Sequence, residues 1–128
     1  MKQSIFKEKY PIFSYEIKKD EISKSSVDEI IAYYKEKIDN HPVAVYIATF
    51  DHYKHTSSLA EHNINPDIKD VKNIIFCFGA EIPTSKVAAI RPRSIGVCDM
   101  GDSFVIDFME APNEKANSFM EEWTKNLS

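Results

Sequence analysis

The chain has 128 residues, a length that predicts a single domain spanning residues 1–128. Hydrophobic residues make up 43% of the chain and charged residues 28%, a composition typical of globular proteins that excludes a disordered chain. The 16 basic and 20 acidic residues give a net charge of −4, which argues against a nucleic-acid partner because binding to phosphate requires a basic surface.

Nothing in the chain resembles a segment that would take it to or through a membrane. No apolar run approaches the roughly 20 residues of a membrane span, and no signal-like apolar segment follows Met1. We therefore expect no membrane partner and a cytoplasmic location. In that reducing compartment Cys77 and Cys98 would remain thiols, each within an apolar run where a free cysteine behaves as a small hydrophobic residue.

The first predicted elements are a strand and a capped helix. Residues 11–18 alternate apolar and polar side chains, which predicts a half-buried strand. Ser26 and Glu29 form a capping-box pattern at the start of a helix over residues 26–39, which Asn40 and Pro42 end. Its apolar stripe consists of Val27, Ile30, Ile31, Tyr34 and Ile38.

Two apolar runs follow the helix. Residues 43–50 and 73–78 are apolar at consecutive positions, a pattern that predicts internal strands covered on both faces, or covered on one face and sealed by a partner. Between them, residues 52–63 are polar, and the pattern is compatible with either a short helix or an irregular turn. Residues 83–90 fit a short helix that ends before Pro92.

The last elements are a hairpin and a helix. Strands at 95–98 and 104–109 flank a turn in which Gly101 provides the positive φ, and a register centred on Met100-Gly101 places Ser94 opposite Asp107. Apolar residues then recur at helical spacing over residues 112–127.

This order of elements predicts an α+β fold. We expect a mixed, mainly antiparallel sheet of about five strands with amphipathic helices packed on one face.

Several stretches between Ser26 and Pro112 resemble the family called domain of unknown function 302. They are SVDEIIAYYKEKIDNHPVAVYIATFDH with its Asp51-His52 pair, IIFCFGAEIPTSKVAAIRP, and SIGVCDMGDSFVIDFMEAP. The resemblance implies an α+β fold and a homodimer, and it implies no particular chemistry.

A group of histidines is the first candidate site. His52, His55 and His62 follow Asp51 at helical spacing, and imidazoles at i and i+3 can share a divalent metal such as zinc, with Asp51 or Glu61 completing the ligand set. A straight helix would separate His55 from His62 by about 10.5 Å, too far for one metal. The predicted site is therefore His52, His55 and Asp51, and the alternative is a polar surface or a dimer seam.

Arg91 and Arg93, the only arginines in the chain, are the second candidate. A guanidinium recognises carboxylate or phosphate through two parallel hydrogen bonds, which a lysine does not provide. The pair predicts a site for a small anion. The alternatives are ion pairs with Glu81 or Glu110, or ordinary solvation.

Two further residues are weaker catalytic candidates. Asp107 lies among apolar strand residues, where a carboxyl group can act as an acid or base, although simple exposure is the alternative. Cys98 would need a positive neighbour to act as a nucleophile, which favours core packing. Phosphate-binding glycine loops and the common hydrolase and metalloprotease motifs are absent.

Two functions are therefore compatible with the sequence. The first is a non-enzymatic binding or interaction domain, homodimeric, that holds a small anion through Arg91 and Arg93. The second is a metal-dependent enzyme or metal sensor built on His52 and His55.

Overall fold

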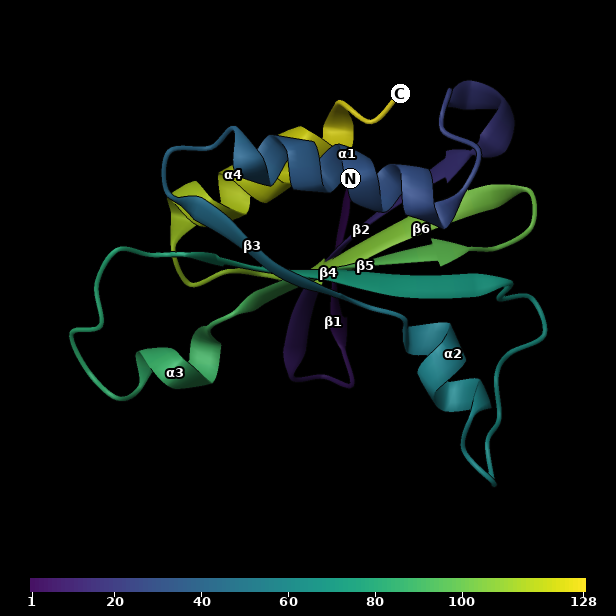
Figure 1. The fold of residues 1–128 in the computed structure, drawn as a ribbon, viewed down its shortest axis with the longest axis horizontal. Helices are drawn as coiled ribbons and strands as arrows, with labels where there is room; N and C mark the ends of the chain where they lie inside the picture. Colours follow the sequence, from purple (N-terminus) through teal and green to yellow (C-terminus); the bar gives the residue numbers. More distant parts are fainter.

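The computed structural model describes residues 1–128 and contains one six-stranded sheet in the order β1-β2-β6-β5-β4-β3 (Figure 1). The strands are β1 (Lys2–Phe6), β2 (Tyr10–Lys18), β3 (Ala44–Phe50), β4 (Asp70–Phe78), β5 (Arg93–Asp99) and β6 (Ser103–Met109). The helices are α1 (Val27–Asp39), α2 (His52–Ser57), α3 (Val87–Ile90) and α4 (Glu114–Lys125), with a 3-10 turn at Lys19–Glu21.

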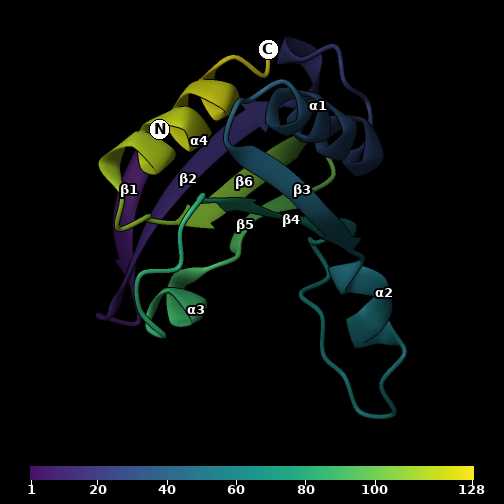
Figure 2. The ribbon, with the colours of Figure 1, turned by 60° about the vertical axis from the view of Figure 1, so that its left-hand side comes forward.

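The predicted α+β class is confirmed. All neighbouring strands pair antiparallel, and the sheet has one strand more than expected because β1 forms a hairpin with β2. The two long helices, α1 and α4, lie side by side over one face, whereas the short helices α2 and α3 stand on the other side of the sheet (Figures 1 and 2). No helix is long and apolar enough to cross a membrane.

The helix predicted over residues 26–39 begins at the predicted cap, whereas the helix predicted over 112–127 is shorter and spans Glu114–Lys125. The hydroxyl of Ser26 accepts a hydrogen bond from the backbone N–H of Glu29 at 3.2 Å. The carboxylate of Glu29 turns back to the backbone N–H of Ser25 at 2.8 Å, so the capping box closes one residue earlier than its usual pattern. Asn113 caps α4 by accepting from the N–H groups of Lys115 and Ala116.

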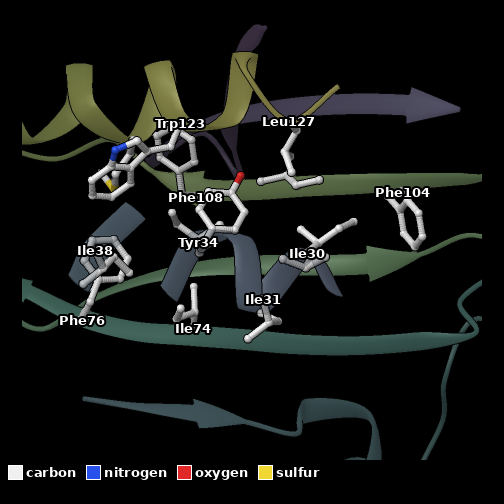
Figure 3. Packing of buried hydrophobic residues seen from close by; sticks show 14 of the residues in the cluster. Ile30, Ile31, Tyr34, Ile38, Ile74, Phe76, Phe104, Phe108, Trp123 and Leu127 are labelled. Carbon is white, nitrogen blue, oxygen red and sulfur yellow. The ribbon is translucent and has the colours of Figure 1, made fainter. Parts of the chain in front are cut away.

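The core lies between the long helices and the sheet. Nineteen buried hydrophobic residues form one cluster. Figure 3 shows Tyr34 of α1 at its centre, with the hydroxyl oxygen pointing toward α4. Ile31 and Trp123 are each 7% exposed, which confirms that both helices close their apolar stripes over the sheet.

One strand is in a different environment from the one predicted. Residues 43–50 were expected to form an internal strand, covered on both faces or covered on one face and sealed by a partner, but β3 is an edge strand that pairs only with β4. Ala44 is buried, whereas Val45 is 62% and Ile47 53% exposed. A run of consecutive apolar residues indicates that both faces of a strand favour burial, but it does not show whether residues of the same chain bury them.

The hairpin register also differs from the prediction. Gly96, and not Ser94, lies opposite Asp107. The turn residues are Gly101 and Asp102, because the N–H of Met100 donates to the carbonyl of Ser103 at 2.8 Å. Gly101 has φ +97°, so the glycine has the predicted role but occupies the first turn position instead of the second. A shift of two residues leaves each side chain on its original face of the sheet.

Candidate functional site

A cavity of about 290 Å³ opens beside the N-terminal end of α4. Its polar side chains come from Arg91, Arg93, Lys115, His41 and Asn113, and no aspartate or glutamate lines it. Apolar side chains form the rest of the wall, among them Val43, Phe78, Ile90, Ala111, Ala116 and Phe119. The structure therefore brings together the two predicted arginines in a basic, largely apolar cavity.

Arg91 is placed there by the chain around Gly79. Gly79 has φ +146°, and a Cβ atom at that position would lie 2.6 Å from the guanidinium carbon of Arg91. Only glycine leaves this space open for the Arg91 side chain. One guanidinium nitrogen, Nη1, donates to the backbone carbonyl of Glu81 at 2.7 Å. Arg91 forms no ion pair with the Glu81 carboxylate, which was one of the predicted alternatives.

Arg93 is more deeply placed, at the first position of β5. It donates to the backbone carbonyl of Met109, while its Nε atom is buried without a hydrogen-bond partner. Burial lowers the pKa of Arg93 because the charged guanidinium loses solvation. Glu110 is within 3.4 Å of the Gln3 amide instead, so neither arginine is neutralised by a carboxylate.

His41 is a member of the cavity that the sequence analysis did not single out. Its Nδ1 atom accepts from the backbone N–H groups of Val43 and Ala44, both at 3.0 Å, which leaves the proton of the neutral ring on Nε2. Nε2 is buried without a conventional partner, and the ring centroid lies 4.3 Å from that of Phe119 in an edge-to-face arrangement. The only available sequence signal was its position next to Pro42 at the end of α1.

A second cavity, of about 370 Å³, lies against the sheet face opposite α1 and α4. It brings together three predicted residues, His52, Cys98 and Asp107. The ring Nδ1 of His52 is 3.0 Å from the Oδ1 atom of Asn73, and the carboxylate of Asp107 accepts from the hydroxyl of Ser14. The arginines do not reach this cavity, so the predicted sites are divided between the two cavities.

The environment of Cys98 is unsuited to nucleophilic chemistry. Burial raises its pKa to about 11, and the nearby carboxylates of Asp107, Asp99 and Asp70 add to the shift because they disfavour a second negative charge. Its thiol lies 3.4 Å from the sulfur of Met100. Cys98 therefore remains a thiol at neutral pH, and Cys77 is also free.

The predicted metal residues have other structural roles. The Asp51 carboxylate caps α2 by accepting from the N–H of Lys54 at 3.0 Å, and the rings of His52 and His55 pack beside Phe50. Because α2 ends at Ser57, His62 lies beyond it. No group of three or more histidine, cysteine, aspartate or glutamate side chains is arranged to hold a metal ion.

Comparison with known proteins places the chain in a family. A family model described as "Family of unknown function (DUF6858)" matches residues 1–128. The chain belongs to this family. The match does not support the resemblance to domain of unknown function 302, although both families are of unsettled function. No curated protein and no solved structure matches the chain significantly.

Proposed function

We propose that the chain is a non-enzymatic binding protein for a small organic anion, held in the cavity of Arg91 and Arg93. The observation that carries this proposal is the presence of two arginines, without any carboxylate partner, in the wall of one cavity. Buried polar groups in proteins are normally paired, and a guanidinium near apolar surface has a strong preference for an anionic partner.

The wall of the cavity indicates the kind of anion. Apolar side chains such as Phe78, Ile90 and Phe119 would contact the body of a ligand, while the guanidinium groups and Lys115 attract its charge. The cavity also lies at the N-terminal end of α4, where the helix dipole favours negative charge. A carboxylate attached to a small apolar group fits these features better than inorganic phosphate, which has no apolar part.

Thermal unfolding with added ligand tests the proposal. Benzoate and inorganic phosphate are compared with chloride at equal ionic strength, in the full chain and in Arg91→Ala. A ligand at 100 times its Kd stabilises the folded state by about 2.7 kcal/mol, which for a chain of this size raises Tm by several degrees. We expect benzoate to give the larger shift, and Arg91→Ala to abolish it.

Lys86→Ala is the matched control, because it removes one positive charge next to α3 from a residue that does not line the cavity. A benzoate shift that survives in Arg91→Ala, or disappears equally in Lys86→Ala, would contradict the proposal. The alternative of a metal-dependent enzyme or sensor at His52 and His55 has no specific structural observation in its favour. Elemental analysis of the purified protein, with and without His52→Ala, is its direct test.

A further inference from the structure

A polar row crosses the sheet face that α1 and α4 leave uncovered. In the strand register Asn73 lies opposite Gly96, Gly96 lies opposite Asp107, and Asp107 lies opposite Ser14. Residues that oppose each other on antiparallel strands point to the same side of the sheet, so these four positions share one face. A Cβ atom at Gly96 would lie 3.4 Å from the Asn73 amide nitrogen and 3.6 Å from the Asp107 carbonyl oxygen. Glycine at this position therefore leaves a gap in the row.

The gap is part of the second cavity, which has a volume of about 370 Å³. Helix α2 and the segment that follows it stand on this side of the sheet and contribute the rest of the wall (Figure 2). Ile64, Ile68 and Val71 are the aliphatic side chains of the lining. Binding sites for small molecules have volumes of roughly 300–1,000 Å³ and combine apolar walls with a few polar groups. The cavity therefore has the size and the wall of a small-molecule site.

Asp107 provides the only carboxylate in this cavity, and no lysine or arginine lines it. The hydroxyl of Ser14 donates to Oδ1 of Asp107. Asp107 takes part in none of the ion pairs of the chain. Its negative charge is therefore not neutralised by the protein, and the carboxylate has lone pairs free to accept further hydrogen bonds.

His52 adds a second hydrogen-bond acceptor. The amide nitrogen of Asn73 donates to the hydroxyl oxygen of Ser94 at 3.0 Å, so the amide oxygen of Asn73 is the atom that faces His52. This oxygen can only accept, and Nδ1 of His52 lies 3.0 Å from it, so Nδ1 carries the proton of the neutral ring. Nε2 of His52 is then without a proton and accepts hydrogen bonds.

The charges around the cavity favour a cation. Burial raises the pKa of Cys98 in the cavity wall to about 11, and the carboxylates of Asp107, Asp99 and Asp70 contribute to this rise because they oppose a further negative charge. A metal ion would need a larger set of ligands, and no group of three or more suitable side chains is arranged to hold one. An organic cation with N–H donors fits the cavity better.

We propose that this cavity binds a small organic molecule through a primary ammonium group. An ammonium has three N–H donors and no acceptor, which matches the Asp107 carboxylate and Nε2 of His52, because both accept. The apolar part of the ligand contacts the aliphatic side chains of the wall. This cavity shares no lining residue with that of Arg91 and Arg93, so the proposal stands independently of the anion site.

Isothermal titration with benzylamine tests the proposal, and benzyl alcohol provides the same ring without the charge. We expect benzyl alcohol to bind at least about tenfold more weakly than benzylamine. Asp107→Asn should weaken benzylamine binding by a similar factor. Asp102→Asn is the matched control, because it removes the same charge from an exposed residue that does not line the cavity. Gly96→Val keeps Asp107 but fills the gap, so it should also weaken binding at least about tenfold.

Two further measurements separate the proposal from its alternatives. Titration with Nα-acetyl-lysine methylamide presents the same ammonium on a lysine side chain, and tighter binding of this compound than of benzylamine would assign the cavity to a partner protein. NMR of the imidazole nitrogens should find the proton of neutral His52 on Nδ1, and a proton on Nε2 would refute the acceptor role of that atom.

The titrations also define the results that would overturn the proposal. One is a lack of benzylamine binding up to millimolar concentrations. Another is binding that Asp107→Asn leaves unchanged, or that Asp102→Asn weakens equally. Benzoate binding is expected to be the same in Asp107→Asn as in the wild type, so failure at one cavity remains distinguishable from failure at the other.

Discussion

The buried hydrogen bonds between α1 and α4 allow a quantitative test of the core. Tyr34 and Thr124 are both fully buried, and their hydroxyl oxygens are 2.7 Å apart. The hydroxyl of Thr124 also donates to the carbonyl of Met120 at 2.8 Å, so the Tyr34 hydroxyl must be the donor between the pair. Burial raises the pKa of Tyr34, so it keeps this proton throughout the neutral range.

This direction of donation predicts unequal effects for two conservative substitutions. Tyr34→Phe removes one hydrogen bond and leaves Thr124 still bonded to Met120, which should cost about 0.5–1.5 kcal/mol of unfolding free energy. Thr124→Val leaves the Tyr34 hydroxyl buried without an acceptor, which should cost about 1–3 kcal/mol. In the double variant no buried donor lacks an acceptor, so its loss of unfolding free energy should be smaller than the sum of the two single losses.

Urea unfolding at neutral pH, followed by the fluorescence of the single tryptophan, provides the measurement. Trp123 is 7% exposed in the folded chain, so its emission should shift to the red as the core opens. The assignment of donor and acceptor is refuted if Tyr34→Phe destabilises the protein as much as Thr124→Val, or if the two effects are simply additive.

Three other predictions follow from local contacts. Ser26→Ala removes the cap of α1 and should lower the unfolding free energy by about 1 kcal/mol in the same urea experiment, with an unchanged m-value. The pKa of Cys98 rises from 9.0 to about 11 on folding, so between these values the folded state holds a proton that the unfolded state has lost. The free energy of unfolding should therefore fall as the pH rises through that window. Asp107→Asn should lower the pKa of Cys98 and so speed alkylation of its thiol at pH 8–9. An unchanged alkylation rate would exclude the Asp107 carboxylate as a cause of the raised pKa. Gly79→Ala should move the Arg91 side chain out of the cavity and weaken the benzoate-induced Tm shift, while circular dichroism shows a retained fold.

The elements with periodic patterns were predictable from the sequence. The stripe of α1, from Val27 to Ile38, is buried as expected, and so are Ala116, Met120 and Trp123 of α4 and Leu127 just after it. The start of α1 was predictable because Ser26 caps it through a hydrogen bond within four residues of sequence. Local patterns of this kind contain most of the information that determines where the long helices lie.

Long-range features could not be predicted in the same way. The apolar residues of β3 resemble those of an internal strand, because position at the sheet edge depends on which strands pair and not on the strand's own residues. β1 was missed since KQSIF has no clear alternation and depends on pairing with β2. The predicted hairpin register was wrong by two residues, because strand twist decides which of the two turn positions Gly101 occupies.

The candidate sites likewise combine features that were predictable from nearby residues in the sequence with features that were not. The proximity of Arg91 and Arg93 was predictable from sequence, since one residue separates them. The contribution of His41 was not, because it approaches the arginines only after α1, β3 and α4 are packed. Likewise, the local roles of Asp51, which caps α2, and of His52, which lies 3.0 Å from Asn73, depend on how α2 is placed against β4 and could not be read from their spacing.

The pairing of β2 with β6 has a consequence for how the chain is made. Residues 12–18 find their partners only at 103–109, whereas β3, β4 and β5 each pair with the next strand along the chain. During synthesis the β1–β2 hairpin must therefore wait, without its neighbour strand, until residues 103–109 have left the ribosome. The sheet can therefore be completed only after residues 103–109 have been synthesised, and a nascent chain released before that point would leave its N-terminal hairpin unpaired.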